Sequence, residues 1–253
     1  MRKGGVDVRK DGAVLRITLN MPERLNVLDV ETRKKIFEAL EANEDNEDVK
    51  CVVFRAEGRA FSAGADLRYL VKLDRKQAKE YASFVKSFLF YIENYPKPTI
   101  GVVEGIAVGG GLELLLALDI VVASEDSRFG QTELKVGLIP GGGGTQRLQL
   151  IAGQRIAREM VFTSRLITAS EAKEAGIVNR VVKKDLIEEE LKKITDTISE
   201  KDSKLLALAK KAINYGLKKG IEKGLEFESK LYSTILASKE AKQAIRNFLG
   251  TKI

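Results

Sequence analysis

The order of strand-like and helix-like segments constrains the fold of this 253-residue chain most. Strand patterns alternate with helix patterns through about the first three-quarters of the sequence, and after residue 183 the pattern is helical to the end. Such alternation is typical of an α/β protein. We therefore predict an α/β core in residues 1–190 and a helical oligomerisation region in residues 191–253. Plain packing of the tail helices on the core is the alternative.

Local signals place several of these elements. An alternating strand is expected at residues 14–19, after a turn at 9–13. Asp29 is the expected N-cap of a helix that turns Ile36 and Leu40 to one face. Buried strands are expected at residues 50–56, 99–103 and 120–123, and a loop at 58–66 is expected to lead into a helix that ends before Pro96.

Two segments share a pattern that suits chemistry. In Ser62–Asp66 and in Gly109–Gly111, a strand runs into a turn of small residues that opens a helix. Backbone N–H groups at such turns are unpaired, and the helix dipole favours negative charge beside them. Two of these groups converging on one carbonyl oxygen would stabilise an oxyanion. Tight turns and close backbone packing explain the same glycines equally simply.

The complete absence of histidine narrows the chemistry further. Ser-His-Asp hydrolysis, Cys-His proteolysis and histidine-ligated metal sites are excluded, so proton transfer falls to other side chains. Glu113 follows the glycine triplet at the start of an otherwise apolar helix, and Glu133 stands in a loop before Gly137. Each alone could be structural. Together with the two turns, they are the best available acid and base.

Charge and cysteine content limit the partners. The formal net charge of +7 fits ordinary solubility or an anionic ligand such as a phosphorylated cofactor, and fits nucleic acid less well. Cys51, the single cysteine, lies in an apolar run and is expected to be buried in a protein of the reducing cytoplasm. No signal peptide and no membrane span are expected. The glycine run at 141–146 lacks the Gly-Lys-Ser/Thr of a phosphate-binding loop.

Several ordered motifs resemble the crotonase (enoyl-CoA hydratase/isomerase) superfamily over nearly the whole chain. They are residues 20–26 (NMPERLN), 60–67 (AFSAGADL), 105–114 (GIAVGGGLEL), 129–133 (FGQTE) and 137–148 (GLIPGGGGTQRL). The resemblance implies a spiral core of ββα units, a C-terminal helical trimerisation region and a homotrimer or homohexamer. It also implies an acyl-CoA thioester substrate, with coenzyme A as part of the substrate, no separate cofactor and no metal.

The resemblance also assigns roles to residues. It implies that the N–H groups of Ala65 and Gly110 form the oxyanion hole, and that Glu113 and Glu133 are the catalytic pair of an enoyl-CoA hydratase. Glu113 would deprotonate the water that attacks C3, and Glu133 would deliver the proton to C2. The residues that it implies for substrate or CoA binding are Arg24, Ala63, Asp66, Leu67, Gly109 and Phe248.

The sequence departs from the family pattern at two places, and three alternative functions are considered. Thr132 stands where the family often has proline, and the C-terminus is shorter than the family's basic ending. An isomerase would need only the second glutamate, so the presence of Glu113 argues against it. The reverse reaction, dehydration of a 3-hydroxyacyl-CoA such as 3-hydroxypropionyl-CoA, fits equally. An RNA-binding homologue is the alternative from another class, because lysines fall on one expected helical stripe (Lys72, Lys76, Lys79 and Lys86).

Overall fold

The computed structural model describes residues 5–250, which form two compact units that divide between Lys201 and Asp202. The boundary predicted at residue 190 falls inside α7 (Ile187–Ser199). Ile187 and Leu191 of this helix are buried against strands of the larger unit, so the larger unit continues to the end of α7.

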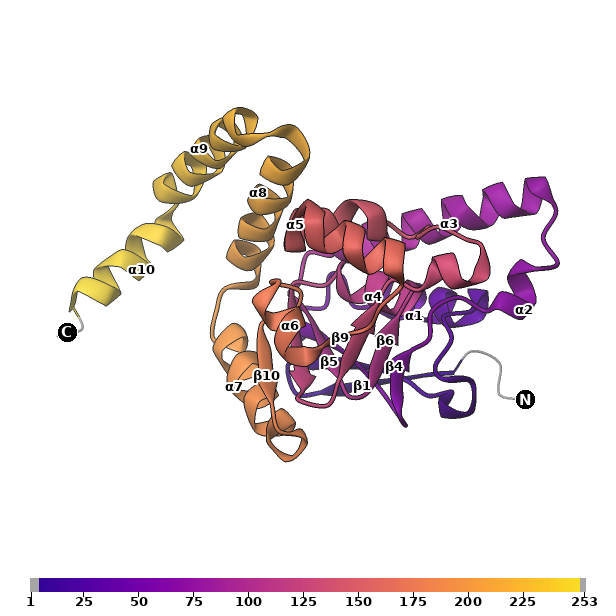
Figure 1. Ribbon diagram of the computed structural model, residues 1–253. Helices are drawn as coiled ribbons and strands as arrows, with labels where there is room; N and C mark the ends of the chain where they lie inside the picture. The colour runs from indigo at the N-terminus through magenta and orange to yellow at the C-terminus, as the bar shows by residue number, and fades with distance from the viewer. Residues whose placement is uncertain (1–4, 251–253) are drawn as a thin grey trace. The chain divides into compact units, whose positions relative to one another are not determined.

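Two sheets form the larger unit (Figure 1). In the six-stranded sheet, β1 and β2 are antiparallel and the remaining neighbours are parallel. In the four-stranded sheet, only the β8–β9 pair is antiparallel. The strands of the first sheet, in order, are β1 (Val6–Asp11), β2 (Val14–Leu19), β3 (Cys51–Ala56), β5 (Thr99–Val103), β7 (Ile120–Ser124) and β10 (Arg180–Val182). Those of the second are β4 (Ala60–Ser62), β6 (Ile106–Val108), β8 (Arg128–Gly130) and β9 (Ile167–Thr168).

The chain winds through these sheets as a spiral. Three times in succession, a strand of the large sheet is followed by a strand of the small sheet and then by helix. The central residue of each short strand is fully buried, namely Phe61, Ala107 and Phe129. The predicted spiral of ββα units is thereby confirmed. The helical segments that follow are α2 (Leu67–Leu70) with α3 (Arg75–Glu93), then α4 (Gly110–Leu115), then η2 (Glu133–Val136) with α5 (Gly144–Thr163).

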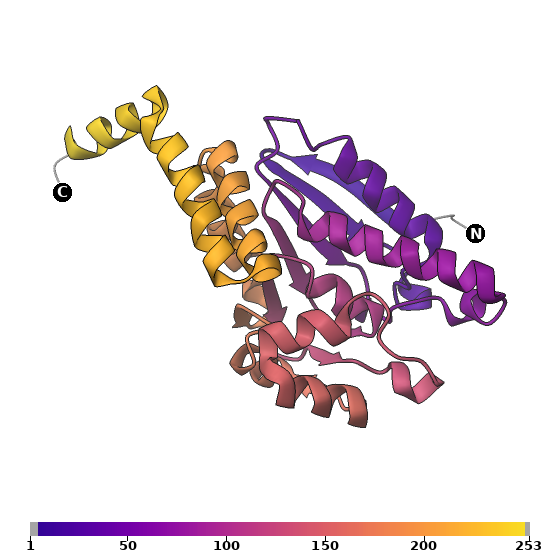
Figure 2. The same cartoon turned by 90° about the horizontal axis from the view of Figure 1, so that it is seen from above.

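Helix α1 (Val30–Glu41) begins where the sequence predicts. The Asp29 side chain accepts a hydrogen bond from the Thr32 N–H at 2.8 Å, and Ile36 and Leu40 are buried in the core. Figure 2 shows α1 and α3 running alongside each other. Their contact includes the rings of Phe37 and Tyr91, whose centroids lie 4.7 Å apart. Helices α1 and α3 together supply one wall of the site described below.

Some local predictions were wrong. The segment 58–66 contains strand β4, and β6 and β8 were also missed, because three residues are too few to show alternation. The single helix expected before Pro96 is two helices, since Asp74 and Gln77 form a capping box that starts α3. Lys72 lies in the turn between α2 and α3, so the predicted lysine stripe does not lie on one helix.

The remaining short elements are η1 (Pro22–Arg24), η3 (Lys184–Leu186) and α6 (Ala169–Glu174). Helix α6 begins at a capping box, in which Thr168 and Glu171 exchange hydrogen bonds. Cys51 is buried, as expected, and burial raises the pKa of its thiol to about 11. No helix within residues 5–250 combines the length and apolarity that a membrane span requires.

The second unit contains α8 (Ser203–Lys219), α9 (Ile221–Ala237) and α10 (Lys239–Gly250). Helices α8 and α9 pack closely at Gly216 and Gly224, and the rings of Tyr215 and Phe227 stack with centroids 4.3 Å apart. Many large apolar side chains of this unit are exposed in the single chain, including Ile213, Leu217, Ile221, Leu225, Tyr232, Ile245, Phe248 and Leu249. The predicted helical tail is confirmed; its role in assembly remains a prediction.

Candidate functional site

A pocket of about 580 Å³ lies in the larger unit. Every site residue predicted within this unit lines it: Arg24, Ala63, Ala65, Asp66, Leu67, Gly109, Gly110, Glu113 and Glu133. Residues from four distant parts of the sequence are thus brought together. Phe248, the remaining predicted site residue, lies on α10 of the second unit with 68% of its surface exposed, and its role stays a prediction.

Glu113 is held by the glycine-rich loop before α5. Its Oε1 accepts hydrogen bonds from the N–H groups of Gly142 at 2.7 Å and Gly144 at 2.9 Å. Arg147 fixes this loop by donating to the Gly142 carbonyl at 2.8 Å and by pairing with Glu93 at 3.1 Å. Within residues 5–250, no group donates a hydrogen bond to the other oxygen of Glu113, Oε2. That oxygen is therefore available to a molecule in the pocket.

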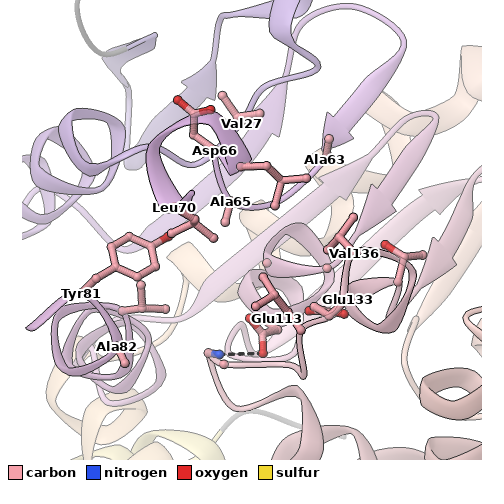
Figure 3. Close-up of a pocket in the computed structure, with 18 of the residues that line it drawn as sticks. Val27, Ala63, Ala65, Asp66, Leu70, Tyr81, Ala82, Glu113, Glu133 and Val136 are labelled. Carbon is pink, nitrogen blue, oxygen red and sulfur yellow. Dashed lines mark hydrogen bonds between the residues drawn. The ribbon is translucent and has the colours of Figure 1, made fainter. Parts of the chain in front are cut away.

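Glu133 approaches the same space from η2 (Figure 3). Its Oε1 would lie 3.5 Å from a Cβ atom at position 109, in van der Waals contact with it, and the φ of Gly109 (+54°) favours glycine there. The buried Gln131 amide, turned so that its nitrogen faces Glu133, donates to both carboxylate oxygens at 3.0 Å. Glu133 is therefore oriented by a neighbour two residues earlier in the chain.

Both carboxyl groups have raised pKa values. Burial raises the pKa of Glu113, although the N–H groups of Gly144 and Gly142 and the charges of Arg33 and Arg147 oppose the shift. Burial also raises the pKa of Glu133 to about 7, and the nearby charge of Glu113 adds to the shift. The backbone N–H of Thr132 acts in the opposite direction. Proline at this position would lack that N–H.

The two small-residue turns meet backbone to backbone at the pocket. A Cβ atom on Gly64, whose φ is +88°, would lie only 2.7 Å from the Gly110 nitrogen, and one on Gly110 would lie 3.5 Å from the Ala65 nitrogen. In the described chain, neither the Ala65 N–H nor the Gly110 N–H donates a hydrogen bond to another residue. Two unpaired N–H groups therefore lie beside the pair of carboxylates.

Arg24 and Asp66 form an ion pair at the pocket wall. The Arg24 Nη2 lies 2.6 Å from the Asp66 Oδ2, and Arg24 also lies 3.5 Å from Asp29. Asp66 additionally caps α2 through the Arg68 N–H. Two of the predicted CoA-binding residues are thus linked to each other, and the Arg24 side chain keeps 35% of its surface exposed.

Sequence reasoning missed some of the residues that shape this site. It assigned no role to the amides of Gly142 and Gly144, to Gln131, or to Arg33 and Tyr81 in the pocket wall. Arg33 alone carried a signal, because it falls three residues before Ile36 on the buried face of α1. Among the residues that the structure describes, no group of three or more acidic or cysteine side chains is placed to hold a metal ion.

This arrangement is typical of an enzyme that moves protons beside a polarised carbonyl group, because desolvated carboxylates face unpaired backbone amides. The sequence matches the enoyl-CoA hydratase/isomerase family over residues 9–252, and the chain belongs to that family.

Individual relatives agree with this assignment. The chain is 32% identical to the short-chain-enoyl-CoA hydratase of Clostridium acetobutylicum, over 98% of this chain and 96% of that protein. It is 32% identical to the crotonyl-CoA hydratase of Syntrophomonas wolfei, over 96% and 94%. The crystal structure of enoyl-CoA hydratase from Bacillus anthracis superimposes with a TM-score of 0.91 at 32% identity, covering 98% of this chain and 97% of the other. The predicted crotonase fold is confirmed.

Proposed function

We propose that the protein is an enoyl-CoA hydratase that adds water reversibly across the C2–C3 double bond of a 2-enoyl-CoA, giving a 3-hydroxyacyl-CoA. The observation that carries this proposal is the pairing of Glu113 and Glu133 in one pocket, both with raised pKa values. An isomerase would need only the second carboxylate. Relatives named for hydration of enoyl-CoA and crotonyl-CoA support the same reaction.

The proposed mechanism uses both glutamates, Glu113 and Glu133, together with the two unpaired backbone N–H groups. The thioester oxygen accepts hydrogen bonds from the Ala65 and Gly110 N–H groups. Ionised Glu113 takes a proton from water through Oε2 while the water oxygen bonds to C3. The electrons of the double bond move into the thioester enolate, and protonated Glu133 gives its proton to C2. The pair begins and ends with one proton in total, so both carboxyls titrate as a coupled unit.

Dehydration of a 3-hydroxyacyl-CoA is the same reaction in reverse and uses the same groups. Coenzyme A enters as part of the substrate, and the proposal requires no further cofactor. The RNA-binding alternative gains no specific support, because its lysines are divided between α3 and the preceding turn.

The proposal is tested by following the loss of enoyl-thioester absorbance on a series of 2-enoyl-CoA substrates of increasing chain length, beginning with crotonyl-CoA. We expect turnover on at least one short or medium substrate. No turnover on any member of the series would overturn the proposal.

Replacing Gly64 by alanine should disable the proposed oxyanion hole. Its Cβ atom would press on the Gly110 nitrogen at 2.7 Å and force the two turns apart. We expect kcat/KM for crotonyl-CoA to fall by roughly 100-fold or more, the scale of a lost oxyanion donor. Gly12→Ala is the matched control, because Gly12 also has positive φ (+57°) but a Cβ atom there meets nothing within 4 Å. If the Gly64→Ala variant were as active as Gly12→Ala, the close approach of the two turns at Gly64 would not be needed for the proposed oxyanion hole.

We propose further that the protein assembles as a homotrimer or a homohexamer through its second unit. The exposed apolar side chains of α8–α10 support this, since such surfaces commonly mark interfaces. Light scattering should give three or six times the mass of the 27.9 kDa chain, and a stable monomer at micromolar concentration would contradict the assembly. A cytoplasmic location is part of the same proposal, supported by the buried free thiol of Cys51.

A further inference from the structure

The pocket wall contains a buried arginine that the proposed hydration mechanism does not use. Arg33 of α1 lines the pocket, yet only 2% of its surface is exposed. Its Nη1 donates to the Leu28 carbonyl and, at 3.1 Å, to the Tyr81 hydroxyl of α3. The guanidinium carbon lies 5.7 Å from the centre of the Tyr81 ring. The guanidinium is thus fixed in place by the segment just before α1 and by α3.

Among the residues that the structure describes, this cation has no acidic partner of its own. Within residues 5–250, no carboxylate oxygen lies within 4.0 Å of the Arg33 side chain, whereas Arg24 in the same pocket pairs with Asp66. Glu113 and Asp29 act on Arg33 only through their more distant charges. A guanidinium offers five N–H donors, and the two bonds of Nη1 leave most of them unused.

Burying an unpaired charge is costly, and an arginine remains charged under all ordinary conditions. Apolar side chains that line the same pocket, such as Leu70, Ala82 and Val85, carry no charge that could compensate it. A planar guanidinium is the side chain best suited to bind a carboxylate through two parallel hydrogen bonds. An anionic group on the ligand would satisfy the unused donors and the charge together.

We infer that Arg33, held by Tyr81, selects an acyl group that carries a carboxylate, so that the substrate is the CoA monothioester of an unsaturated dicarboxylic acid. The inference rests on the proposed hydratase function and names its substrate class. Arg33 is a specificity-determining residue in this account, and the proton transfers remain with Glu113 and Glu133.

The inference is tested by ligand binding, which does not depend on turnover. Succinyl-CoA and isocaproyl-CoA have acyl groups of nearly the same shape, since a terminal carboxylate replaces a terminal isopropyl group, and neither has a double bond to hydrate. Calorimetry on the full chain should show that succinyl-CoA binds at least about tenfold more tightly, the scale of hydrogen bonds to a charged group. Equal or weaker binding of succinyl-CoA would overturn the inference.

Substitutions of Arg33 test whether this residue causes the preference for succinyl-CoA over isocaproyl-CoA. Arg33→Met should abolish the preference for succinyl-CoA. Lys34→Met is the matched control, because it removes the same charge from an exposed position on the same helix and should keep the wild-type ratio. If Arg33→Met does not fold, Arg33→Lys replaces it and should lower the ratio several-fold, since lysine lacks the planar fork. A folded Arg33 variant that keeps the wild-type ratio would overturn the assignment.

Turnover measurements distinguish failure of this inference from failure of the proposed function. Wild-type protein should hydrate glutaconyl-CoA, which bears a terminal carboxylate, with a higher kcat/KM than crotonyl-CoA. If succinyl-CoA binds preferentially but no enoyl-CoA is hydrated, the proposed function fails and the ligand class stands. If crotonyl-CoA is hydrated and glutaconyl-CoA is the poorer substrate, the inference fails and the proposed function stands.

Discussion

A Glu113→Gln variant should lose hydration of 2-enoyl-CoA by roughly 100- to 10,000-fold in kcat, or about 3–5 kcal/mol of transition-state stabilisation. Glutamine keeps an oxygen that can accept the hydrogen bonds from the Gly142 and Gly144 N–H groups, so the loop before α5 should keep its position. What is lost is the ability of the second oxygen atom to take a proton from water. Steady-state kinetics with crotonyl-CoA measures the effect.

Glu125→Gln is a suitable control for this change, because Glu125 is an exposed glutamate between β7 and β8, away from the pocket lining. The control should retain wild-type kinetics, and circular dichroism should show the same fold for all three proteins. If Glu113→Gln kept near-full activity while folded, the assignment of the water-activating base to Glu113 would be wrong.

A Glu133→Gln variant should show a loss of similar size, because the proton for C2 has no other donor among the proposed groups. It should also change the pH profile. The proposed hydration needs protonated Glu133, whose pKa is raised to about 7, so wild-type kcat/KM should fall as pH rises through about 7. On the acid side, kcat/KM should fall as Glu113, with its pKa raised above 4.5, becomes protonated.

Glutamine does not titrate in this range, so the alkaline limb near pH 7 should be absent from the residual activity of Glu133→Gln. The measurement is kcat/KM for crotonyl-CoA across pH 5 to 9 for the wild type and the variant. An alkaline limb that persists near pH 7 in Glu133→Gln would show that another group supplies the proton.

The architecture could be predicted in part from local patterns. The N-cap at Asp29 and the strand at 14–19 follow from side-chain chemistry within a few residues, and both are confirmed. No fixed-period repeat is visible, although the fold repeats a ββα unit. Strands β3, β5 and β7 begin at residues 51, 99 and 120, so the insertion of α2 and α3 into one unit hides the period.

Residues of the candidate site could be predicted from the sequence where they lie within a recognisable motif. Both glutamates and both turns could be named because the chain lacks histidine and because small-residue turns expose unpaired backbone N–H groups. The family motifs then indicated which residues occupy the catalytic positions. The amides of Gly142 and Gly144 could not be found from composition, since their contacts to Glu113 depend on how segments from different spiral turns meet. Gln131 lies only two residues before Glu133, but composition does not show that its amide faces the carboxylate. Arg33 could have been noticed as a charge on a buried helical face.

Water addition itself is the central claim, and heavy-oxygen water tests it most directly. Crotonyl-CoA is incubated with the wild-type protein in this labelled water, and the masses of the CoA thioesters are measured by mass spectrometry. Hydration predicts a product heavier than crotonyl-CoA by one molecule of the labelled water, with the heavy oxygen on C3, and the same solution with a Glu113→Gln, Glu133→Gln double variant should yield essentially none. An unlabelled isomer of the same mass would contradict the account, and so would unchanged substrate with crotonyl-CoA and with every other 2-enoyl-CoA of the series.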